Sequence, residues 1–196
     1  MCMTGNDIRP FKQRLRAACK EKRRALSETE KARLDRKITN KFLNLFQYRE
    51  AQTLLCYVST EIEVDTFQIL RRALEDGKTV AVPRCVDGTR EMEFYILTDL
   101  KQLSTGAFGV LEPCCEKCEK LTDLSDGLCV VPALCYDLDG YRLGYGKGYY
   151  DRFLSRFSGN TVGLVYENCL CGSLPHGKFD RRIEKIVTEN RVINIA

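Results

Sequence analysis

The spacing of apolar side chains predicts two helices in the first quarter of the chain. In the first, apolar residues recur every three or four positions, at Ile8, Phe11, Leu15 and Cys19. A Ser-Glu-Thr-Glu sequence follows, beginning at Ser27, and has the form of a capping box, in which a serine side chain starts a helix. The second helix is therefore predicted to begin there and to run to about residue 46.

Short apolar runs predict strands that alternate with further helices. The predicted strands are residues 53–59, 79–83, 92–97, 127–137 and 161–166, followed by a hairpin over 185–195. Helices are predicted over 66–76 and 149–157, and Gly77 ends the first of them. This alternation indicates an α/β fold, with a mostly parallel central sheet flanked by helices in three layers. No linker rich in Pro, Gly or Ser divides the chain, so we expect a single domain over residues 1–196.

The composition is that of a globular protein rather than a membrane or secreted one. Hydrophobic residues make up 44% of the chain and charged residues 30%. No apolar run approaches the roughly 20 residues that span a bilayer. The start of the chain carries charges where a signal peptide would have its apolar core. We therefore expect a cytoplasmic protein without membrane attachment.

The eleven cysteines are mostly scattered singly, as buried reduced thiols are. An odd number in a chain of this length does not indicate a disulfide framework. The exception is the cluster Cys114, Cys115 and Cys118, which could hold part of a zinc site if Cys169 or Cys171 supplied a fourth ligand. Nothing in the sequence brings those residues together, so a reduced, exposed loop is the favoured interpretation.

Positive charge is concentrated in the first predicted helix. The net charge of the chain is only +4, but eight Lys or Arg residues and one acid lie between Arg9 and Arg24. Lys12 and Arg16 stand one helical turn apart. Such a helix is either a solvated face or an anion-binding surface for nucleic acid, nucleotide phosphates or acidic small molecules.

The segment of residues 142–154 is the most unusual part of the sequence. It reads RLGYGKGYYDRFL, in which three glycines alternate with Tyr145 and Lys147 before a predicted helix. It is either a mobile surface turn or a backbone cradle for phosphate, which needs glycines for close approach. The spacing matches neither a Walker A loop nor a dinucleotide-binding fingerprint. Its place after a strand favours a ligand site, since ligands of open α/β sheets lie beyond the carboxyl ends of strands.

The same segment resembles the ATP-binding motif of the 5-formyltetrahydrofolate cyclo-ligases, also called methenyltetrahydrofolate synthetases. Further segments resemble the family in order and spacing: KQRLR, STEIEVDT, VAVPRC, FGVLEP, CVVPALCYDLDGYRLG and LPHGKFDRRIEKIVTE. The resemblance implies conversion of 5-formyltetrahydrofolate and MgATP into 5,10-methenyltetrahydrofolate, ADP and phosphate. In the family's scheme the γ-phosphoryl group passes to the formyl oxygen, and N10 then closes the ring as phosphate departs. Such a reaction needs positioning and charge neutralisation rather than a protein nucleophile.

The resemblance also implies roles for individual residues. Arg16 and Lys147 are implied to be catalytic. The implied ATP-binding residues are Lys12, Arg16, Arg142, Leu143, Gly144, Tyr145, Gly146, Lys147, Gly148, Tyr149 and Tyr150. Asp151 and Asp180 match the acids that hold Mg²⁺, a hard ion that favours carboxylates and phosphate oxygens. Without the resemblance, Asp151 would be an ordinary acid in the first turn of a helix and Asp180 a loop acid.

Three residues are implied to contact the folate, namely Cys56, Glu61 and Tyr149. A carboxylate such as Glu61 can accept paired hydrogen bonds from the amino and ring N–H groups of a pterin. Either Glu61 or Glu63 could instead be an exposed acid of the TEIE sequence. Cys56 stands where the family usually has a larger apolar residue, and either Tyr149 or Tyr150 could be a core aromatic residue.

Two other classes of function remain open on the residues alone. A nucleotide- or RNA-binding module would use the basic helix and the glycine segment without catalysis, although the aromatic residues form no RNP-like pattern. A sugar-phosphate isomerase-like protein is suggested only by analogy of fold. The resemblance favours a cytoplasmic, monomeric cyclo-ligase that binds ATP and 5-formyltetrahydrofolate, with or without a polyglutamate tail, and neither nucleic acid nor membrane.

Overall fold

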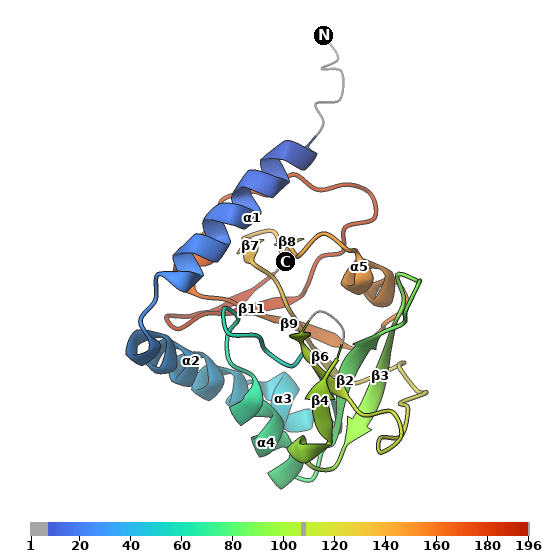
Figure 1. The fold of residues 1–196 in the computed structure, drawn as a ribbon. Coiled ribbons are helices and arrows are strands. Elements are labelled where there is room, and N and C mark those ends of the chain that lie inside the picture. The colour runs from blue at the N-terminus through green and yellow to red at the C-terminus, as the bar shows by residue number, and fades with distance from the viewer. Residues whose placement is uncertain (1–7, 107–108, 196) are drawn as a thin grey trace.

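Helices and strands alternate through most of the chain in a computed structural model that describes residues 8–106 and 109–195 (Figure 1). The helices are α1 (Arg9–Arg24), α2 (Glu28–Leu43), α3 (Phe46–Glu50), α4 (Phe67–Glu75) and α5 (Tyr149–Leu154), with 3-10 turns η1 (Leu100–Gln102) and η3 (Glu167–Cys169). α2 begins where predicted, since Ser27 Oγ accepts a hydrogen bond of 3.2 Å from the backbone N–H of Glu30. No helix in these described ranges is long and apolar enough to cross a membrane.

A seven-stranded sheet forms the centre of the fold. Its strands, in spatial order, are β12 (Val192–Asn194), β11 (Lys185–Val187), β9 (Asn160–Leu164), β6 (Leu128–Val131), β1 (Thr53–Cys56), β2 (Thr79–Cys85) and β3 (Met92–Leu97). The five inner strands are parallel, and the edge strands β12 and β3 are antiparallel to their neighbours. The mostly parallel sheet is therefore confirmed, and the carboxyl ends of its inner strands meet at one edge.

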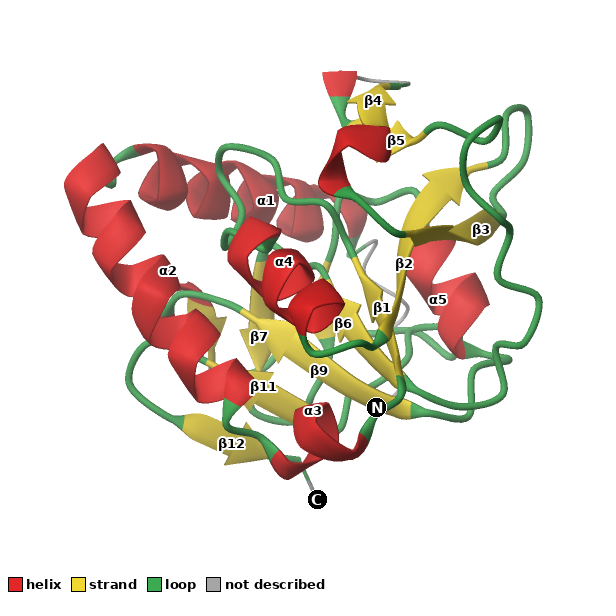
Figure 2. Ribbon diagram, turned by 90° about the horizontal axis from the view of Figure 1, so that it is seen from below, coloured by secondary structure: helices red, strands yellow, loops and turns green. Residues whose placement is uncertain are grey.

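Helices cover both faces of this sheet (Figure 2). Successive residues of a strand point to opposite faces. In β1, Leu54 belongs to a core that it shares with α2, α3 and α4, whereas Leu55 belongs to a second core that it shares with α1 and α5. Phe42 of α2 and Phe153 of α5 are almost fully buried in these two cores. The three-layer architecture is confirmed.

One predicted strand is two strands in the structure. The run 127–137 divides into β6 and β7 (Cys135–Asp137), and β7 pairs with β10 (Leu170–Cys171) and β8 (Arg142–Leu143) in a second sheet. Pro132 stands at the break, and proline has no N–H to donate to a neighbouring strand. The break leads the chain out of the central sheet and toward the glycine segment.

Two further features differ from the sequence prediction. α2 ends at Leu43 rather than near residue 46, because Leu45 is extended (ψ 141°) and starts α3 as its N-cap. A two-stranded hairpin of β4 (Leu103–Thr105) and β5 (Leu111–Pro113) was not predicted, since its strands are too short to form a pattern.

Arg23 fixes α1 across the edge of the sheet. Its buried guanidinium donates hydrogen bonds to the carbonyl oxygens of Ala133 (2.6 Å), Leu134 (2.9 Å) and Ile62 (3.2 Å). Bonds to three carbonyls use the planar fork of arginine, which lysine does not have. α1 is thereby held to the loops that follow β6 and β1.

Candidate active site

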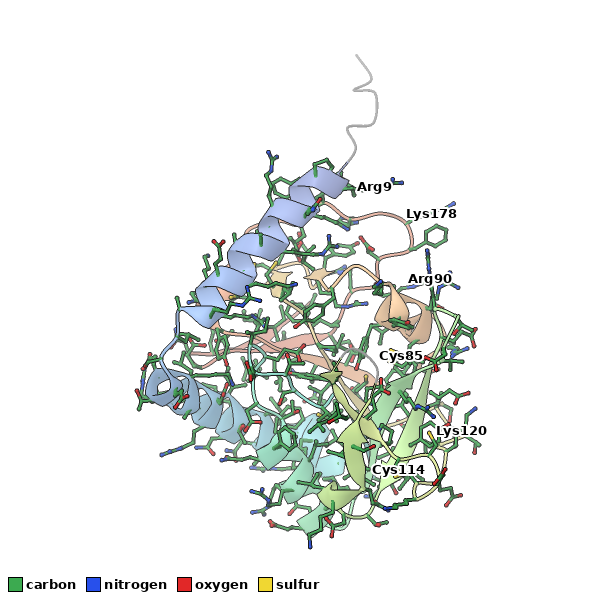
Figure 3. All side chains as sticks on the ribbon, in the orientation of Figure 1. Arg9, Cys85, Arg90, Cys114, Lys120 and Lys178 are labelled. Carbon is green, nitrogen blue, oxygen red and sulfur yellow. The ribbon has the colours of Figure 1, made fainter. Side chains whose placement is uncertain are left out.

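A cavity of about 700 Å³ lies between α1 and the carboxyl ends of the parallel strands. Val58, just after β1, and Pro132, just after β6, line it, as does Cys85 at the end of β2 (labelled in Figure 3). Residues of α1, the glycine segment and β5 complete the lining. The volume is in the range of pockets that hold cofactor-sized ligands. The cavity lies where the sheet topology predicts a ligand site.

The glycine segment approaches α1 closely. Arg16 Nε donates a hydrogen bond of 2.8 Å to the carbonyl oxygen of Gly144. Gly146 has φ +94°, and a Cβ there would lie 3.2 Å from Nη2 of Arg16. Gly148, with φ +78°, is the N-cap of α5. These positive φ values belong to a backbone conformation that only glycine adopts readily, so the glycines are needed for the shape of the turn.

Two ion pairs lie beside this turn. Lys12 Nζ is 2.8 Å from Asp180 Oδ2, and Arg142 Nη2 is 2.6 Å from Asp151 Oδ1. Burial by itself would raise the pKa of Asp180, but the hydrogen bonds from Lys12 and from the backbone N–H of Gly177 outweigh it and hold this pKa below its usual value. All four charged side chains line the cavity.

The two carboxylates fit a magnesium ion only in company with phosphate. The hydrogen bonds described involve one oxygen of each, Oδ1 of Asp151 and Oδ2 of Asp180. Within residues 8–106 and 109–195, no three His, Cys, Asp or Glu side chains are grouped so that they could hold a metal ion. The donor set therefore suits a Mg²⁺ that takes most of its ligands from phosphate and water.

A buried acid lies toward the C-terminal end of α1, where Arg23 donates a hydrogen bond to the carbonyl oxygen of the neighbouring residue Ile62. Glu63 is 5% exposed, and its Oε2 accepts hydrogen bonds of 2.9 Å from both the backbone N–H and the hydroxyl of Thr60. Its Oε1 accepts a hydrogen bond of 3.0 Å from the hydroxyl of Tyr145. No ion pair to Glu63 occurs in the part of the chain that the structure describes. A buried carboxylate without a cationic partner, facing a cavity, is suited to a ligand that brings N–H donors.

Two of the expected folate contacts do not line this cavity. Glu61 is exposed in the turn after β1. Cys56, the last residue of β1, is fully buried in the core that β1 shares with α2, α3 and α4, and this burial raises the pKa of its thiol well above the usual value. Val58 and Glu63, each two positions further along, line the cavity instead. In both cases the residue that lines the cavity stands two positions after the expected one.

The expected residues of the ATP site are brought together. Lys12, Arg16, Asp180 and every residue from Arg142 to Asp151 line the one cavity. The two tyrosines differ in their surroundings. The hydroxyl of Tyr149 donates to the carbonyl oxygen of Thr89 at 3.5 Å, whereas the hydroxyl of Tyr150 is buried without a hydrogen-bond partner in the described part of the chain.

Several lining residues were not predicted. Lys20 and Arg24 continue the spacing of Lys12 and Arg16 along α1, and this four-residue repeat was visible in the sequence. An apolar wall comes from the inner strand β2, the edge strand β3 and the β4–β5 hairpin, through Pro83, Met92, Val110 and Leu111. No local signal marks those four side chains, because only the pairing of the strands brings them to the cavity.

The Cys114–Cys118 cluster lies outside the cavity. Cys114, labelled in Figure 3, lies well away from Arg9 at the start of α1. Cys115 accepts a hydrogen bond from the guanidinium of Arg84, and Cys118 is buried. The three thiols are free cysteines, as in a reduced loop, but the expectation that they are exposed is wrong, since Cys118 is buried and Cys114 and Cys115 are half-buried.

The chain is similar in sequence to curated cyclo-ligases along most of its length. It is 28% identical over 200 residues to the 5-formyltetrahydrofolate cyclo-ligase of Mus musculus, which covers 96% of this chain and 98% of the mouse protein. It is also 28% identical to the probable 5-formyltetrahydrofolate cyclo-ligase of Caenorhabditis elegans, with 95% and 96% covered.

Solved structures agree with the fold. The NMR structure of 5,10-methenyltetrahydrofolate synthetase from Aquifex aeolicus superposes with a TM-score of 0.83 at 32% identity, and 94% of this chain and 93% of that chain are covered. The synthetase from Mycoplasma pneumoniae superposes with a TM-score of 0.72 at 23% identity and supports the fold alone.

Most of the chain also matches a model built for a whole protein family. Residues 9–189 match the sequence model of the 5-formyltetrahydrofolate cyclo-ligase family. That span includes α1, both acids paired with basic residues and the whole glycine segment. The chain belongs to the 5-formyltetrahydrofolate cyclo-ligase family.

Proposed function

We propose that the cavity binds ATP and 5-formyltetrahydrofolate side by side and holds the formyl oxygen against the γ-phosphate. Family membership makes the protein an ATP-dependent cyclo-ligase of one-carbon folate chemistry. The observation that carries the proposal is that one cavity has two chemically different ends. One end has glycines, cations and two carboxylates, and the other has a buried acid beside an apolar wall.

At the first end, the glycine segment and α1 would hold the phosphates. Arg16 is already fixed against the turn by its bond to Gly144, so its guanidinium is positioned before the nucleotide arrives. Lys147 is exposed at the turn and supplies a mobile point charge. On this proposal Arg16 and Lys147 are the catalytic residues, since they would touch the transferred group.

At the second end, Glu63 would take the pterin. Its carboxylate is held by Thr60 and Tyr145, and the apolar side chains of Met92 and Leu111 line the same cavity. A pterin offers an amino group and a ring N–H side by side, and the carboxylate would accept both once the hydroxyl of Thr60 turns away from Oε2, since three of its roughly four acceptor positions are already used. We therefore propose Glu63 and Val58 as folate contacts in place of Glu61 and Cys56.

The chemistry follows from this placement. The formyl oxygen attacks the γ-phosphorus and ADP leaves, which turns a poor leaving group into a phosphate ester. N10 then attacks the formyl carbon, its proton is lost, and the C–O bond breaks to release phosphate and give the methenyl ring. The side chains contribute position and charge. Lys147 and Arg16 would neutralise the charge of the phosphoryl group during its transfer, and Glu63 would orient the pterin so that N5 and N10 face that phosphoryl group.

Mg²⁺, when bound with ATP, would neutralise part of the phosphate charge. Asp151 and Asp180 are the residues that would hold it. Each is now paired with a cation, Arg142 or Lys12, and those cations would turn to phosphate oxygens once the acids bind the ion.

We propose that the partners are small molecules and that nucleic acid is not one, because Lys12 and Arg16 face the cavity rather than an open surface. A monomeric state and a cytoplasmic location stay predictions.

The test is the absorbance of the methenyl product, whose conjugated amidinium absorbs in the near ultraviolet. Purified protein with 5-formyltetrahydrofolate and MgATP is expected to give a rise that requires both ATP and Mg²⁺. Lys147→Ala is expected to slow the rise about 100-fold or more, as loss of a charge that stabilises a transition state does. Lys37→Ala, an exposed charge on α2 away from the cavity, is the control and is expected to leave the rate unchanged. A flat trace from folded protein that still binds ATP would contradict the proposal.

A further inference from the structure

Four cysteine side chains meet between α1 and the second sheet. Cys19 lies on α1, Cys135 on β7, Cys169 at the end of η3 and Cys171 on β10. The first three are buried in one core, and Cys171 packs against that core as a half-buried residue. All four lie outside the lining of the cavity, so the proposed reaction gives them no role.

The four thiols form a chain of hydrogen bonds that leads from the half-buried Cys171 to α1. The thiol of Cys171 is bonded to that of Cys135. Cys135 is in turn bonded to Cys19, and Cys19 to Cys169. The backbone explains these contacts, because β7 and β10 are adjacent parallel strands that bring Cys135 and Cys171 to the same face, and α1 packs against η3.

These contacts also decide which thiols ionise most easily. Hydrogen bonds from Cys135 and Cys169, together with the positive charge of Arg23, lower the pKa of Cys19. The hydrogen bond from Cys135 likewise lowers the pKa of Cys171, and donating to both neighbours raises the pKa of Cys135 itself. A thiolate is the nucleophile of disulfide chemistry, and a thiol of low pKa is the better leaving group. Two reactive sulfurs therefore flank one that can be linked to either.

We propose that these thiols are an oxidation site at which a hydroperoxide produces a disulfide between Cys19 and Cys135. The Cys171 thiolate attacks one oxygen of the peroxide, the O–O bond breaks, and a sulfenic acid and hydroxide are formed. The sulfur of Cys135 then displaces the hydroxyl group of that sulfenic acid, which leaves as water with the proton of Cys135. Finally, the Cys19 thiolate attacks the sulfur of Cys135 and Cys171 leaves as a thiolate. In total, two thiols are oxidised to one disulfide, and the peroxide is reduced to water.

The disulfide joins α1 to the second sheet. α1 carries Lys12 and Arg16 of the cavity lining, so a bond at Cys19 fixes the helix that supplies them. The bond closes a loop of more than about 100 residues, and cross-links that close long loops restrict the unfolded chain most. The oxidised protein is therefore expected to be the more stable form.

The experiment exposes the reduced full-length protein to hydrogen peroxide, blocks the remaining thiols, and maps cross-linked peptides by mass spectrometry without reduction. A peptide pair that joins Cys19 to Cys135 is expected. The thermal midpoint is expected to rise by about 5 °C or more and to return to its starting value after treatment with dithiothreitol. A map in which Cys19 and Cys135 stay unlinked, or a midpoint that does not rise, would overturn the proposal.

Three variants separate this disulfide from general oxidation. Cys19→Ala is expected to lose the rise in thermal midpoint, and a rise of the parent's size in this variant would contradict the proposal. Cys171→Ala is expected to form the Cys19–Cys135 bond at least about tenfold more slowly, since the thiol that meets the peroxide first is gone. Cys129→Ala removes a buried thiol of β6 outside the chain of contacts and should behave like the parent. The peptide map of the parent protein needs no variant, so it decides the matter even if a variant folds poorly.

Discussion

Replacing Glu63 with glutamine tests the folate end of the cavity most directly. Glutamine has the same shape and keeps one oxygen, which can still accept the two bonds from Thr60. Its amide nitrogen would face the hydroxyl of Tyr145, which can accept a hydrogen bond in place of donating one. The variant therefore changes the charge of the acid and little of its surroundings.

The loss follows from the hydrogen bonds that the carboxylate would make. A hydrogen bond to a charged group contributes about 1.5–3 kcal/mol, and a pterin would make two with Glu63, one of them in place of the bond from the Thr60 hydroxyl. Losing about 3 kcal/mol of binding lowers kcat/KM roughly 100-fold, since each 1.4 kcal/mol is a factor of ten. The folded state should not suffer, because the variant removes a buried charge that lacks a cationic partner in the described residues.

The assay is kcat/KM for 5-formyltetrahydrofolate at saturating MgATP, with the thermal midpoint recorded for each variant. Glu63→Gln should lose about 100-fold in kcat/KM while unfolding at the same temperature as the parent or above it. Glu61→Gln, an exposed acid two positions away, should stay within twofold. The reasoning is refuted if Glu61→Gln loses the activity and Glu63→Gln keeps more than a third of it.

Two further predictions concern the phosphate end. Gly146→Ala places a Cβ at a residue with φ +94°, which costs about 1–2 kcal/mol, and only 3.2 Å from Arg16, so the KM for ATP is expected to rise about tenfold. Gly172→Ala, at a position with open space, should leave this KM unchanged. Equal effects of the two variants would count against the close approach of Gly146 to Arg16. Asp180→Asn tests the free energy of unfolding. The pKa of Asp180 is held low in the folded state, so the ionised acid stabilises the fold above its unfolded pKa of about 3.9. This contribution is lost as the pH falls through the lower pKa of the folded state. Urea unfolding should therefore show the variant less stable than the parent by under about 1 kcal/mol at pH 6, with the difference shrinking as the pH falls below about 3.9, and a difference independent of pH would contradict the assignment.

The order of the helices and strands could be predicted because each is marked by a local pattern. The cations of α1 repeat with the helical period, and the parallel strands are short apolar runs. The prediction of one strand over residues 127–137 was wrong at Pro132. The residues on both sides of this proline are apolar, so the sequence did not indicate that β6 and β7 belong to different sheets. A run of apolar residues reports burial and not the partner against which it is buried.

The choice between Glu61 and Glu63 could not be made from the sequence. Both acids stand in the TEIE sequence, one on each side of Ile62. The alternation separates them from the apolar Ile62 but does not indicate which of the two acids a turn will bury. The turn after β1 decides this, because Thr60 folds back and donates twice to Glu63. The apolar wall was missed for a related reason, since Leu111 comes from a hairpin that has almost no sequence signal.

The ion pair between Lys12 and Asp180 joins positions 168 residues apart. β11, an inner strand of the sheet, also follows Asp180 in the chain. During translation, a nascent chain can therefore display the glycine segment and most of the sheet while its cavity still lacks Asp180 and its sheet an inner strand. We therefore expect a chain whose synthesis stops before Asp180 to have neither a complete cavity lining nor a complete sheet.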